Sequence, residues 1–413
     1  MTAARRWIVA CVLAGFALRL GFACLYWTGQ PLTHDEREYL ALARSIVRGD
    51  GFRYPADEPA PGTGQRFGRA PGYPAFLALL AVSEPAASTP LRVKIAQSAV
   101  GAVGIWLIAA LAGRTAGPRG AVLAAAIAAI YPPLVWMPAY ALSETLYSTL
   151  ALGSALALEK GTTAFFRKKR EQPTVLAGLL TGAAILVRPA TLAFLPLAFV
   201  WLWRQARTVA LLYVAIALAV VAPWTIRNVR VYGHFVAVAT EGGVTFWTGN
   251  HPLARGEGDL AANPDLKAAD LEFRTAHAGL NADELEAAYY RDAFEWIRTH
   301  PLAWASLLAR KALFTLVPIG PSYRLHSTRY FYASVVSYAL LLPAALAGVW
   351  RLRAAPHRPV ALWLMAASTI IVGLLFFPQE RFRIPVIDPA LIVTAAALAG
   401  CSADERTRRR PDV

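Results

Sequence analysis

Cysteine, charge and long polar segments are all scarce in this sequence. Three cysteines occur among 413 residues, and their spacing fits neither a disulfide framework nor a thiolate metal site. Charged residues make up 16% of the chain, whereas an average soluble domain carries about 25%. Internal repeats and low-complexity linkers are missing as well. These shortages exclude disordered, collagen-like and disulfide-rich classes of protein.

Apolar residues are abundant instead, and they occur in long blocks. They account for 56% of the chain, the mean hydropathy is +0.42, and short basic or Pro/Gly-rich breaks separate the blocks. The first block, Trp7–Trp27, is as long as a membrane-spanning helix of about 20 residues. It contains Arg19 and no clear cleavage site, so we interpret it as a retained anchor rather than a signal peptide. Nine further blocks lie at residues 93–113, 121–138, 145–160, 174–187, 190–203, 208–224, 330–350, 360–377 and 384–400.

This pattern predicts an all-α, polytopic membrane protein with about ten transmembrane helices, several of them short. Basic residues concentrate in the short breaks and in the tail. The positive-inside rule therefore places these segments, together with both termini, in the cytoplasm. The basic segments are 114–119, 167–170, 204–207, 351–358 and the tail 401–413.

Two long stretches are then left on the extracytoplasmic side, residues 28–92 and residues 225–329. We expect both to pack as a cap on one membrane domain that covers residues 1–400. Within the second stretch, segment 301–318 is apolar but contains two adjacent cations, so we expect an interfacial or re-entrant helix there. The net charge of +15 is spread over the breaks between apolar blocks, and no nucleic-acid partner is expected.

The first external stretch begins with a polar helix start. Thr33 and Glu36 have the spacing of a capping box, in which each side chain binds a backbone amide near the other. This structural role competes with a catalytic role for Glu36, and both interpretations stay open. Asp35 is not needed for the box. An ionised carboxylate at this place, beside cations, can accept a proton from an acceptor hydroxyl or orient it for attack.

A second acidic residue and a set of arginines are predicted at a comparable depth. Glu144 starts a span after a proline-rich break, and acidic side chains at a membrane boundary usually face a cavity or a partner. The arginines lie opposite to the cytoplasmic basic breaks, where an anionic ligand near the lipid headgroups would account for them. Arginine suits phosphate because its planar guanidinium offers paired donors. These external arginines are Arg69, Arg188, Arg227, Arg230, Arg381 and Arg383.

These residues fall in motifs that resemble the GT-C glycosyltransferases. The most similar branch is the bacterial family 39 type, which is related to protein O-mannosyltransferases and to the aminoarabinose transferase that acts on lipid A. The resemblance extends over residues 5–400, and it identifies the superfamily rather than a substrate. Larger relatives add further spans or a soluble domain at the C terminus. The matching motifs, in order, are His34-Asp35-Glu36-x-x-Tyr39, Arg69-x-Pro71-Gly72-Tyr73-Pro74, Ser143–Tyr147, Val187-Arg188-Pro189, Ala222–Asn228, Gly242–Pro252 and Glu380–Pro385.

The resemblance implies a GT-C fold and a sugar donor linked to polyprenyl phosphate, with transfer on the extracytoplasmic face of the bacterial plasma membrane. Carried over by position, Asp35 becomes the base of an inverting displacement and Glu144 takes the second acidic position, with Glu36 as a third catalytic candidate. The cations expected to bind the donor phosphate are Arg69, Arg188, Arg381, Arg383 and Lys311. Further substrate contacts are expected from His34, Tyr39, Tyr73, Arg227, Asn250 and His251.

The implied enzyme is a hexosyl- or pentosyltransferase that works among membrane lipids, without a cofactor, on a lipid, glycan or protein acceptor. A divalent cation is the alternative, and its candidate ligands are His34, Asp35, Glu36 and Glu38. The alternative function is a lipid-linked sugar flippase or other transporter, although such folds tend to show internal repeats and sites near the membrane midplane. A non-catalytic scaffold is a third interpretation. It predicts that removing the charges of Asp35 and Arg381 leaves function intact.

Overall fold

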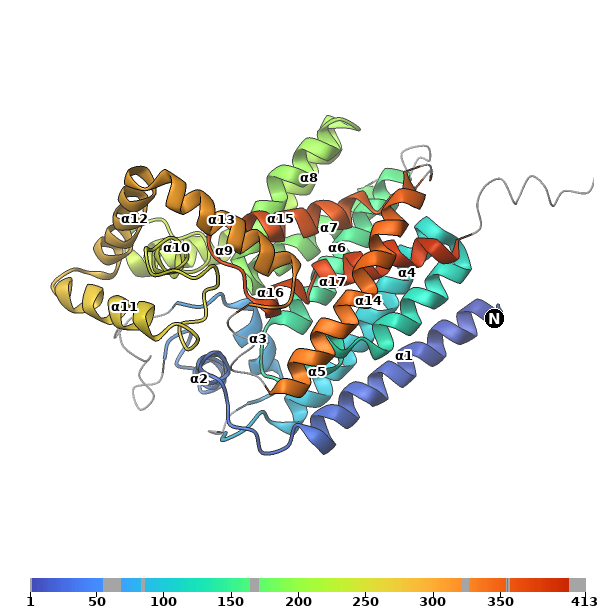
Figure 1. Cartoon of the computed structure of the whole chain (residues 1–413), viewed down its shortest axis with the longest axis horizontal. Coiled ribbons are helices and arrows are strands. Elements are labelled where there is room, and N and C mark those ends of the chain that lie inside the picture. Colours follow the sequence, from blue (N-terminus) through green and yellow to red (C-terminus); the bar gives the residue numbers. More distant parts are fainter. Residues whose placement is uncertain are drawn as a thin grey trace, which may run out of the picture.

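The structure, a computed structural model, describes residues 2–54, 68–82, 86–163, 171–320, 327–353, 355 and 357–400. All regular secondary structure in these residues is helical, as the sequence predicts (Figure 1). The α-helices are α1 (Ala3–Gly21), α2 (His34–Val47), α3 (Gly72–Leu79), α4 (Leu91–Ile130), α5 (Pro132–Trp136), α6 (Glu144–Thr163), α7 (Glu171–Val187), α8 (Phe194–Trp203), α9 (Arg207–Tyr232), α10 (Gly242–Gly249), α11 (Pro264–Ala276), α12 (Ala282–Thr299), α13 (Pro301–Leu316), α14 (Thr328–Leu352), α15 (Val360–Leu375), α16 (Glu380–Arg383) and α17 (Ile387–Ala395). Short π or 3-10 segments are η1 (Phe22–Tyr26), η2 (Met137–Ala139), η4 (Pro189–Ala193) and η6 (Ala396–Ala399).

Two of the predicted spans run through α4, which is not one straight helix. Gly117 has a φ of 72° and Pro118 follows it, so the chain turns inside the predicted basic break 114–119. The two arms touch beside the turn, because a Cβ on Gly113 would lie 3.3 Å from the Cβ of Ala121. The break is therefore a tight turn between two packed helices.

A buried arginine ties the first span to both arms of this hairpin. Arg19 of α1 donates to the carbonyl oxygens of Ala128 (2.9 Å) and Ala129 (3.2 Å) in the second arm. A Cβ on Gly101 of the first arm would lie 3.1 Å from its Nε. Away from water, a guanidinium needs acceptors from the protein. The carbonyl groups at the end of α4, which have no partner within the helix, supply them.

Each of the ten predicted apolar blocks falls on helical structure. Within the described part of the chain, four helices are long and apolar enough to cross a membrane: α1 with η1, α4, α9 and α14. Shorter apolar helices are α7, η4 with α8, α15, and α17 with η6. Large apolar side chains on the outer helices are exposed, such as Leu13 at 62% and Leu340 at 74%. Lipid is the solvent that such surfaces fit, so the chain is a polytopic membrane protein.

The start of the second external stretch differs from the prediction. The apolar block that ends at residue 224 continues as α9 to Tyr232, because the helix accommodates Pro223 and stops only at Gly233, which has a φ of 80°. Beyond the apolar part, Asn228 donates to the carbonyl of Val236 at 3.1 Å and holds the following loop. The loop that follows this helix therefore begins at residue 233 rather than 225.

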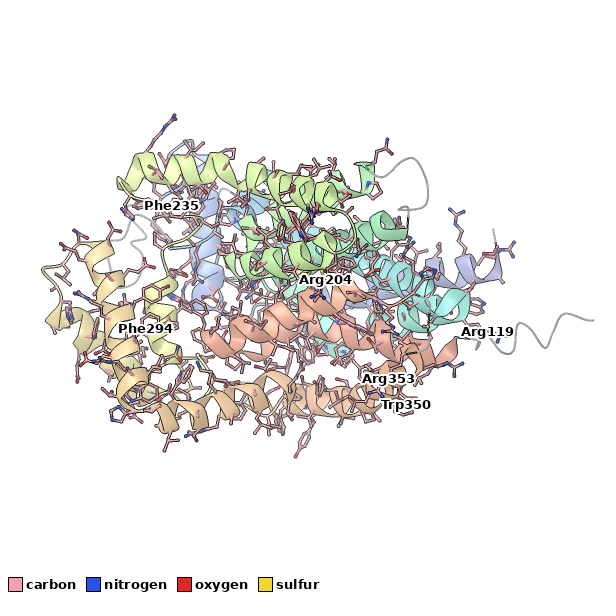
Figure 2. The ribbon with its side chains drawn as sticks, turned by 90° about the horizontal axis from the view of Figure 1, so that it is seen from above. Arg119, Arg204, Phe235, Phe294, Trp350 and Arg353 are labelled. Carbon is pink, nitrogen blue, oxygen red and sulfur yellow. The ribbon has the colours of Figure 1, made fainter. Side chains whose placement is uncertain are left out.

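The two stretches predicted to be external meet at one end of the helix bundle. Figure 1 shows α2, α3 and α10–α13 gathered at the end opposite to the N-terminus, with α2 seen along its axis, across the direction of the long helices. Figure 2 shows Arg119 and Arg353 at the other end from Phe235 and Phe294. Two of the basic breaks, which contain Arg119 and Arg353, are thus separated in this view from the loops predicted to be external, as the positive-inside rule leads us to expect.

The apolar segment 301–318 forms α13, which ends at Leu316 and, as expected, does not qualify as a membrane span. It follows α12 in the group of helices α10–α13 at this end of the bundle. The predicted cytoplasmic basic segments 167–170 and 401–413 lie outside the described residues.

Candidate active site

Helix α2 is fixed at its start by Glu36. One carboxylate oxygen accepts the backbone N–H of Thr33 at 2.9 Å, which completes the predicted capping box. The other accepts from Thr89 Oγ1 and from the backbone N–H of Ala141, both at 2.8 Å. Because the side chain is buried and both oxygens are bonded, Glu36 locks α2 against the segments that precede α4 and α6. The geometry gives Glu36 a structural role, and a catalytic role for it remains a prediction.

One residue earlier on the same turn, Asp35 is held between two arginines. Its Oδ1 lies 2.6 Å from Arg69 Nη2 and its Oδ2 lies 2.6 Å from Arg381 Nη2. Burial alone would raise the pKa of Asp35, but the guanidinium groups of Arg381 and Arg69 outweigh it and hold the pKa well below its usual range. Asp35 is therefore ionised and lies in a cationic environment.

Three carboxylates converge on Arg69. Besides binding Asp35, it donates from Nε to Glu38 Oε2 at 2.6 Å and from Nη2 to the same oxygen, and its Nη1 lies 3.6 Å from Glu241 Oε2. Glu38 follows Asp35 by three residues, so both side chains project from one face of α2. Burial raises the pKa of Glu241, while Arg69 opposes this. Gly68 leaves room for that carboxylate, since a Cβ there would lie 2.3 Å from Glu241 Oε1.

Glu144 forms a second ion pair beside this cluster. It is the first residue of α6, its side chain is buried, and its Oε1 lies 3.4 Å from Arg188 Nη1 and 3.8 Å from Arg381 Nε. Arg188 also lies 4.6 Å from the centre of the Phe382 ring. Arg381 thereby links Glu144 to Asp35, so carboxylates from two separate motifs belong to one site.

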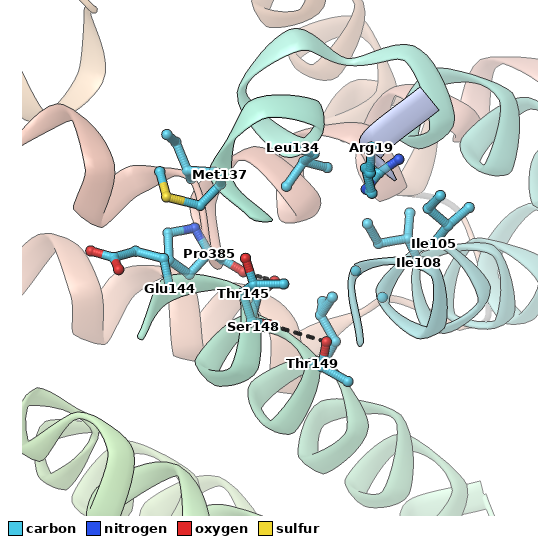
Figure 3. Close-up of a pocket in the computed structure, with 14 residues that line it drawn as sticks. Arg19, Ile105, Ile108, Leu134, Met137, Glu144, Thr145, Ser148, Thr149 and Pro385 are labelled. Carbon is cyan, nitrogen blue, oxygen red and sulfur yellow. Dashed lines mark hydrogen bonds between the residues drawn. The ribbon is translucent and has the colours of Figure 1, made fainter. Parts of the chain in front are cut away.

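A small internal cavity of about 30 Å³ lies between Glu144 and the first span (Figure 3). In Figure 3 the carboxylate of Glu144 points away from Arg19, which lies at the opposite end of the lining. Within the described residues, Arg19 Nε and Thr145 Oγ1 are buried without a hydrogen-bond partner, and the volume is enough for a water molecule. The cavity is far too small for a sugar, so a substrate must reach Glu144 from elsewhere.

A larger groove of about 580 Å³ runs between α2, α3, α6 and α7. None of the charged residues of the site lines it, but the chain segments that form it also carry site residues. Leu146 lines the groove two residues after Glu144. Val187 lines it directly before Arg188. The lining is apolar and includes Ile46, Phe76, Leu79, Leu150, Ala183 and Leu186.

Arg383, which the sequence predicts as a phosphate ligand, faces inward instead. Its Nε lies 2.8 Å from Asp388 Oδ1 and its guanidinium lies 4.2 Å from the Tyr338 ring centre. In helix α16, residues two apart do not share a face, so Arg381 can point into the site only if Arg383 points away. In this arrangement Arg383 neutralises a buried aspartate, and its role as a phosphate ligand remains a prediction.

Lys311 and Asn250 also make structural contacts, and their roles in binding donor phosphate and substrate remain predictions. The ammonium of Lys311 donates to Asn250 Oδ1 at 3.0 Å and to the carbonyls of Leu374 (3.0 Å) and Phe376 (2.6 Å) at the end of α15. All three donors are used, and the cation satisfies carbonyls that the helix end leaves open. Burial lowers the pKa of Lys311 to about 7. The two side chains join α10, α13 and α15, and neither has a free group for a substrate.

Of the two predicted substrate tyrosines, only Tyr39 faces the charged cluster. Its ring lies 5.4 Å from the guanidinium carbon of Arg69 and packs edge-on against Tyr73 at 4.9 Å. Tyr73 is fully buried, and its hydroxyl donates to Gln97 Oε1 at 3.2 Å. Tyr73 therefore packs behind Tyr39, and its contact with a substrate remains a prediction.

The remaining predicted contacts lie around the site rather than in it. His34 is at the rim, with an exposed side chain. Arg227 donates to the backbone carbonyl of Phe52 at 3.2 Å and thereby connects α9 to the first external loop. His251 packs 4.2 Å from the Trp247 ring of α10, and burial lowers its pKa. These three remain predictions as substrate ligands.

Two carboxylates of the cluster were not among the predicted site residues. Glu38 was considered only as a metal ligand, although its helical spacing from Asp35 could have identified it. Glu241 lies in a loop far along the chain, and no sequence signal marks it. Among the described residues, no group of three His, Cys, Asp or Glu side chains is arranged to hold a metal ion. That the site works without a cofactor remains a prediction.

Comparisons with known proteins test the fold. No protein-family model matches the sequence, and no curated protein does. In structure, the chain is similar to the oligosaccharyltransferase of Archaeoglobus fulgidus tethered with an acceptor peptide, with 15% identity, a TM-score of 0.59, and coverage of 96% of this chain and 49% of the other. The chain has the GT-C fold. At such identity the likeness concerns the fold alone, and the chain spans about half the length of that enzyme.

Two further structures belong with this match. The same archaeal enzyme, AglB, in complex with an inhibitory peptide and a dolichol-phosphate aligns at a TM-score of 0.56 and 14% identity, over 96% of this chain and 50% of the other. ArnT from Cupriavidus metallidurans in the apo state aligns at a TM-score of 0.43 and 16% identity, over 96% of this chain and 77% of the other.

Proposed function

We propose that this GT-C chain is a membrane glycosyltransferase that moves a sugar from a polyprenyl-phosphate donor to an acceptor hydroxyl or amine. The proposal rests on one observation above all. An ionised carboxylate, Asp35, lies between two arginines, and helix α2, which carries it, also lines an apolar groove at Ile46 and Val47. A polyprenyl-phosphate sugar has an anionic group and a long apolar chain, and the site offers complementary surfaces for both.

The reaction is a single displacement with inversion at the anomeric carbon. The acceptor oxygen or nitrogen forms the new bond to that carbon, while the bond from the carbon to the phosphate oxygen breaks and leaves its electron pair on the phosphate. Asp35 takes the proton of the acceptor, or orients the acceptor until the proton is lost. Glu144 is held by Arg188 and lies next to Arg381. It positions the acceptor.

The arginines stabilise the charge that develops on the leaving phosphate. Guanidinium groups stay protonated throughout the physiological range and offer paired donors to phosphate oxygens. Arg69, Arg188 and Arg381 are held by carboxylates before the substrate arrives, so little reorganisation is needed during the reaction. Fixed donors aimed at developing charge are usually the largest contribution to catalysis of this kind.

The groove between α2, α3, α6 and α7 would hold the isoprenoid chain. Its lining is apolar, and it adjoins the segments that carry Arg69, Glu144 and Arg188. A lipid lying there would place its phosphate beside the arginines and its sugar beside Asp35. That an enzyme of the same fold has been determined with a dolichol-phosphate supports this class of donor. We place the reaction on the extracytoplasmic face, where the positive-inside rule puts the loops that form the site.

The test is sugar transfer by the purified protein in lipid nanodiscs. A panel of undecaprenyl-phosphate donors, each carrying one hexose or pentose, is supplied together with envelope extract as the source of acceptor, and release of undecaprenyl phosphate is measured. We expect release from at least one donor with the wild type and none with Asp35→Asn. Equal release by the two proteins would contradict the proposal. In sealed liposomes, movement of intact donor across the bilayer without release would identify a transporter instead.

A further inference from the structure

The charged site has no spare positive charge for an anionic substrate. Four carboxylates face three guanidinium groups within it, and every guanidinium already lies within 4.0 Å of a carboxylate oxygen. A phosphate that enters must therefore take a guanidinium from one of these carboxylates. The groups in question are Asp35, Glu38, Glu144 and Glu241 against Arg69, Arg188 and Arg381.

Arg69 is the least able to change partners. Glu38 binds it through two N–H groups and Glu241 approaches a third nitrogen, so it would stay in place without Asp35. Its side chain is only 18% exposed. Arg188 is comparably enclosed, at 17%, and packs on the Phe382 ring.

Arg381 is different in both respects. Its side chain is the most exposed of the three, at 31%, and its one close carboxylate is Asp35, at 2.6 Å. Glu144 lies farther off, at 3.8 Å, and the remaining bond is from Nε to the neutral Gln379 Oε1 at 2.8 Å. A phosphate approaching from solvent would meet Arg381 first, and it would offer a bidentate partner in place of a single carboxylate oxygen.

We infer that Arg381 masks Asp35 until the donor phosphate takes its place as the partner of Arg381. This inference rests on the proposed function and adds the order of events to it. While both Asp35 oxygens are in ion pairs, the carboxylate is a poor proton acceptor. When the phosphate binds Arg381, Oδ2 is released, while Arg69 keeps Oδ1 and the orientation of the side chain. The donor therefore binds first and creates the base that the acceptor needs, so acceptors are not activated in the absence of donor.

Asp35 and the phosphate compete for one guanidinium, so removing the charge of Asp35 strengthens phosphate binding although it abolishes catalysis. The probe is undecaprenyl phosphate, and its affinity for the purified protein in nanodiscs is measured for the wild type, Asp35→Asn, Arg381→Gln and the double variant. We expect Asp35→Asn to bind undecaprenyl phosphate about tenfold more tightly. This factor corresponds to one charged hydrogen bond that no longer competes with the phosphate.

The double variant separates competition from a general loss of negative charge. If Asp35 acts by holding Arg381, the gain from Asp35→Asn disappears in the Arg381→Gln background. Asp50→Asn, which removes an exposed carboxylate paired with Arg53 after α2, is the matched control and should leave the affinity unchanged. Arg381→Lys keeps the positive charge but lacks the paired N–H donors of a guanidinium. It shows whether the site tolerates substitution at this position.

The outcomes are distinct. Tighter binding by Asp35→Asn that depends on Arg381 supports masking. Weaker or unchanged binding by Asp35→Asn, or a gain that persists with Arg381→Gln, overturns masking and leaves the proposed function standing. If the wild type binds no more undecaprenyl phosphate than empty nanodiscs, both the proposed function and the masking fail.

Discussion

Arg69 donates from both Nε and Nη2 to one oxygen of Glu38, a residue one helical turn after Asp35. The pair matters because the position of Arg69 determines where Asp35 can point. Glu38 itself is buried, and its carboxylate is held by the guanidinium of Arg69. We regard it as a positioning residue.

Glu38→Gln should therefore lower turnover without abolishing it. Hydrogen bonds to charged groups contribute roughly 1.5–3 kcal/mol, so we expect kcat to fall about tenfold or more while the KM for the donor changes less. Steady-state kinetics on the purified protein measures this, and Glu38→Asp should recover part of the loss. Full activity in Glu38→Gln would show that Arg69 is held in place by its other partners alone.

Asp388 should matter for stability rather than for catalysis. It is fully buried and pairs with Arg383 at 2.8 Å. Removing one member of a buried pair leaves the other charge without compensation and costs roughly 3–5 kcal/mol. Asp388→Ala should thus unfold at a markedly lower temperature in detergent, with the activity of the folded fraction retained. Asp265→Ala, which breaks an exposed pair with Arg255, should have almost no effect; similar losses in both variants would contradict the assignment.

If the groove holds the isoprenoid chain, a substitution that narrows it should affect long lipid donors more than short ones. Ala75 of α3 is exposed and lines the groove, so Ala75→Trp should obstruct a long isoprenoid chain but not a short one. We expect the KM for an undecaprenyl-phosphate donor to rise about tenfold, with kcat and the kinetics of a farnesyl-phosphate analogue nearly unchanged. Ala303→Trp, at an exposed alanine of α13 outside the groove, is the matched control. An equal change for both donors would place the chain elsewhere.

The burial of Lys311 should make the stability of the protein depend on pH. Burial lowers its pKa to about 7, whereas an unfolded lysine titrates at about 10.4. Between these values the folded protein binds fewer protons than the unfolded one, so the contribution of Lys311 to stability rises with pH and is lost as pH falls through about 7. The apparent Tm of the wild type minus that of Lys311→Met should therefore increase from about pH 7 to about pH 10. Lys267→Met removes an exposed lysine for comparison, and a difference for Lys311→Met that does not vary with pH would refute the prediction.

The helices could be predicted from the sequence because their cause is local. Long apolar blocks, the basic break around Gly117 and the capping box at Thr33 each act over a few residues, and the structure contains all of them. The end of α9 was missed because the apolar pattern stops at residue 224, whereas the helix ends where Gly233 adopts a positive φ.

The site was predictable only in part, because contacts between segments far apart in the sequence determine its arrangement. Charge type and position identified Asp35, Glu144 and the external arginines as candidates, but not which arginine meets which carboxylate. Arg381 and Arg383 are equivalent in sequence, and only the direction of α16 decides that one enters the site and the other a buried pair. Glu241 gives no sequence signal, since tertiary packing alone brings its loop to Arg69.

The central claim is that Asp35 takes part in sugar transfer from a lipid-linked phosphate. It is tested most directly by mass spectrometry of the lipid extract from cells that make either the wild type or Asp35→Asn at equal membrane levels. The account predicts that a polyprenyl-phosphate sugar, one hexose or pentose heavier than polyprenyl phosphate, accumulates in the Asp35→Asn cells, and that the same sugar mass disappears from the envelope. Identical pools of lipid-linked sugar and an unchanged envelope in the two strains would contradict it.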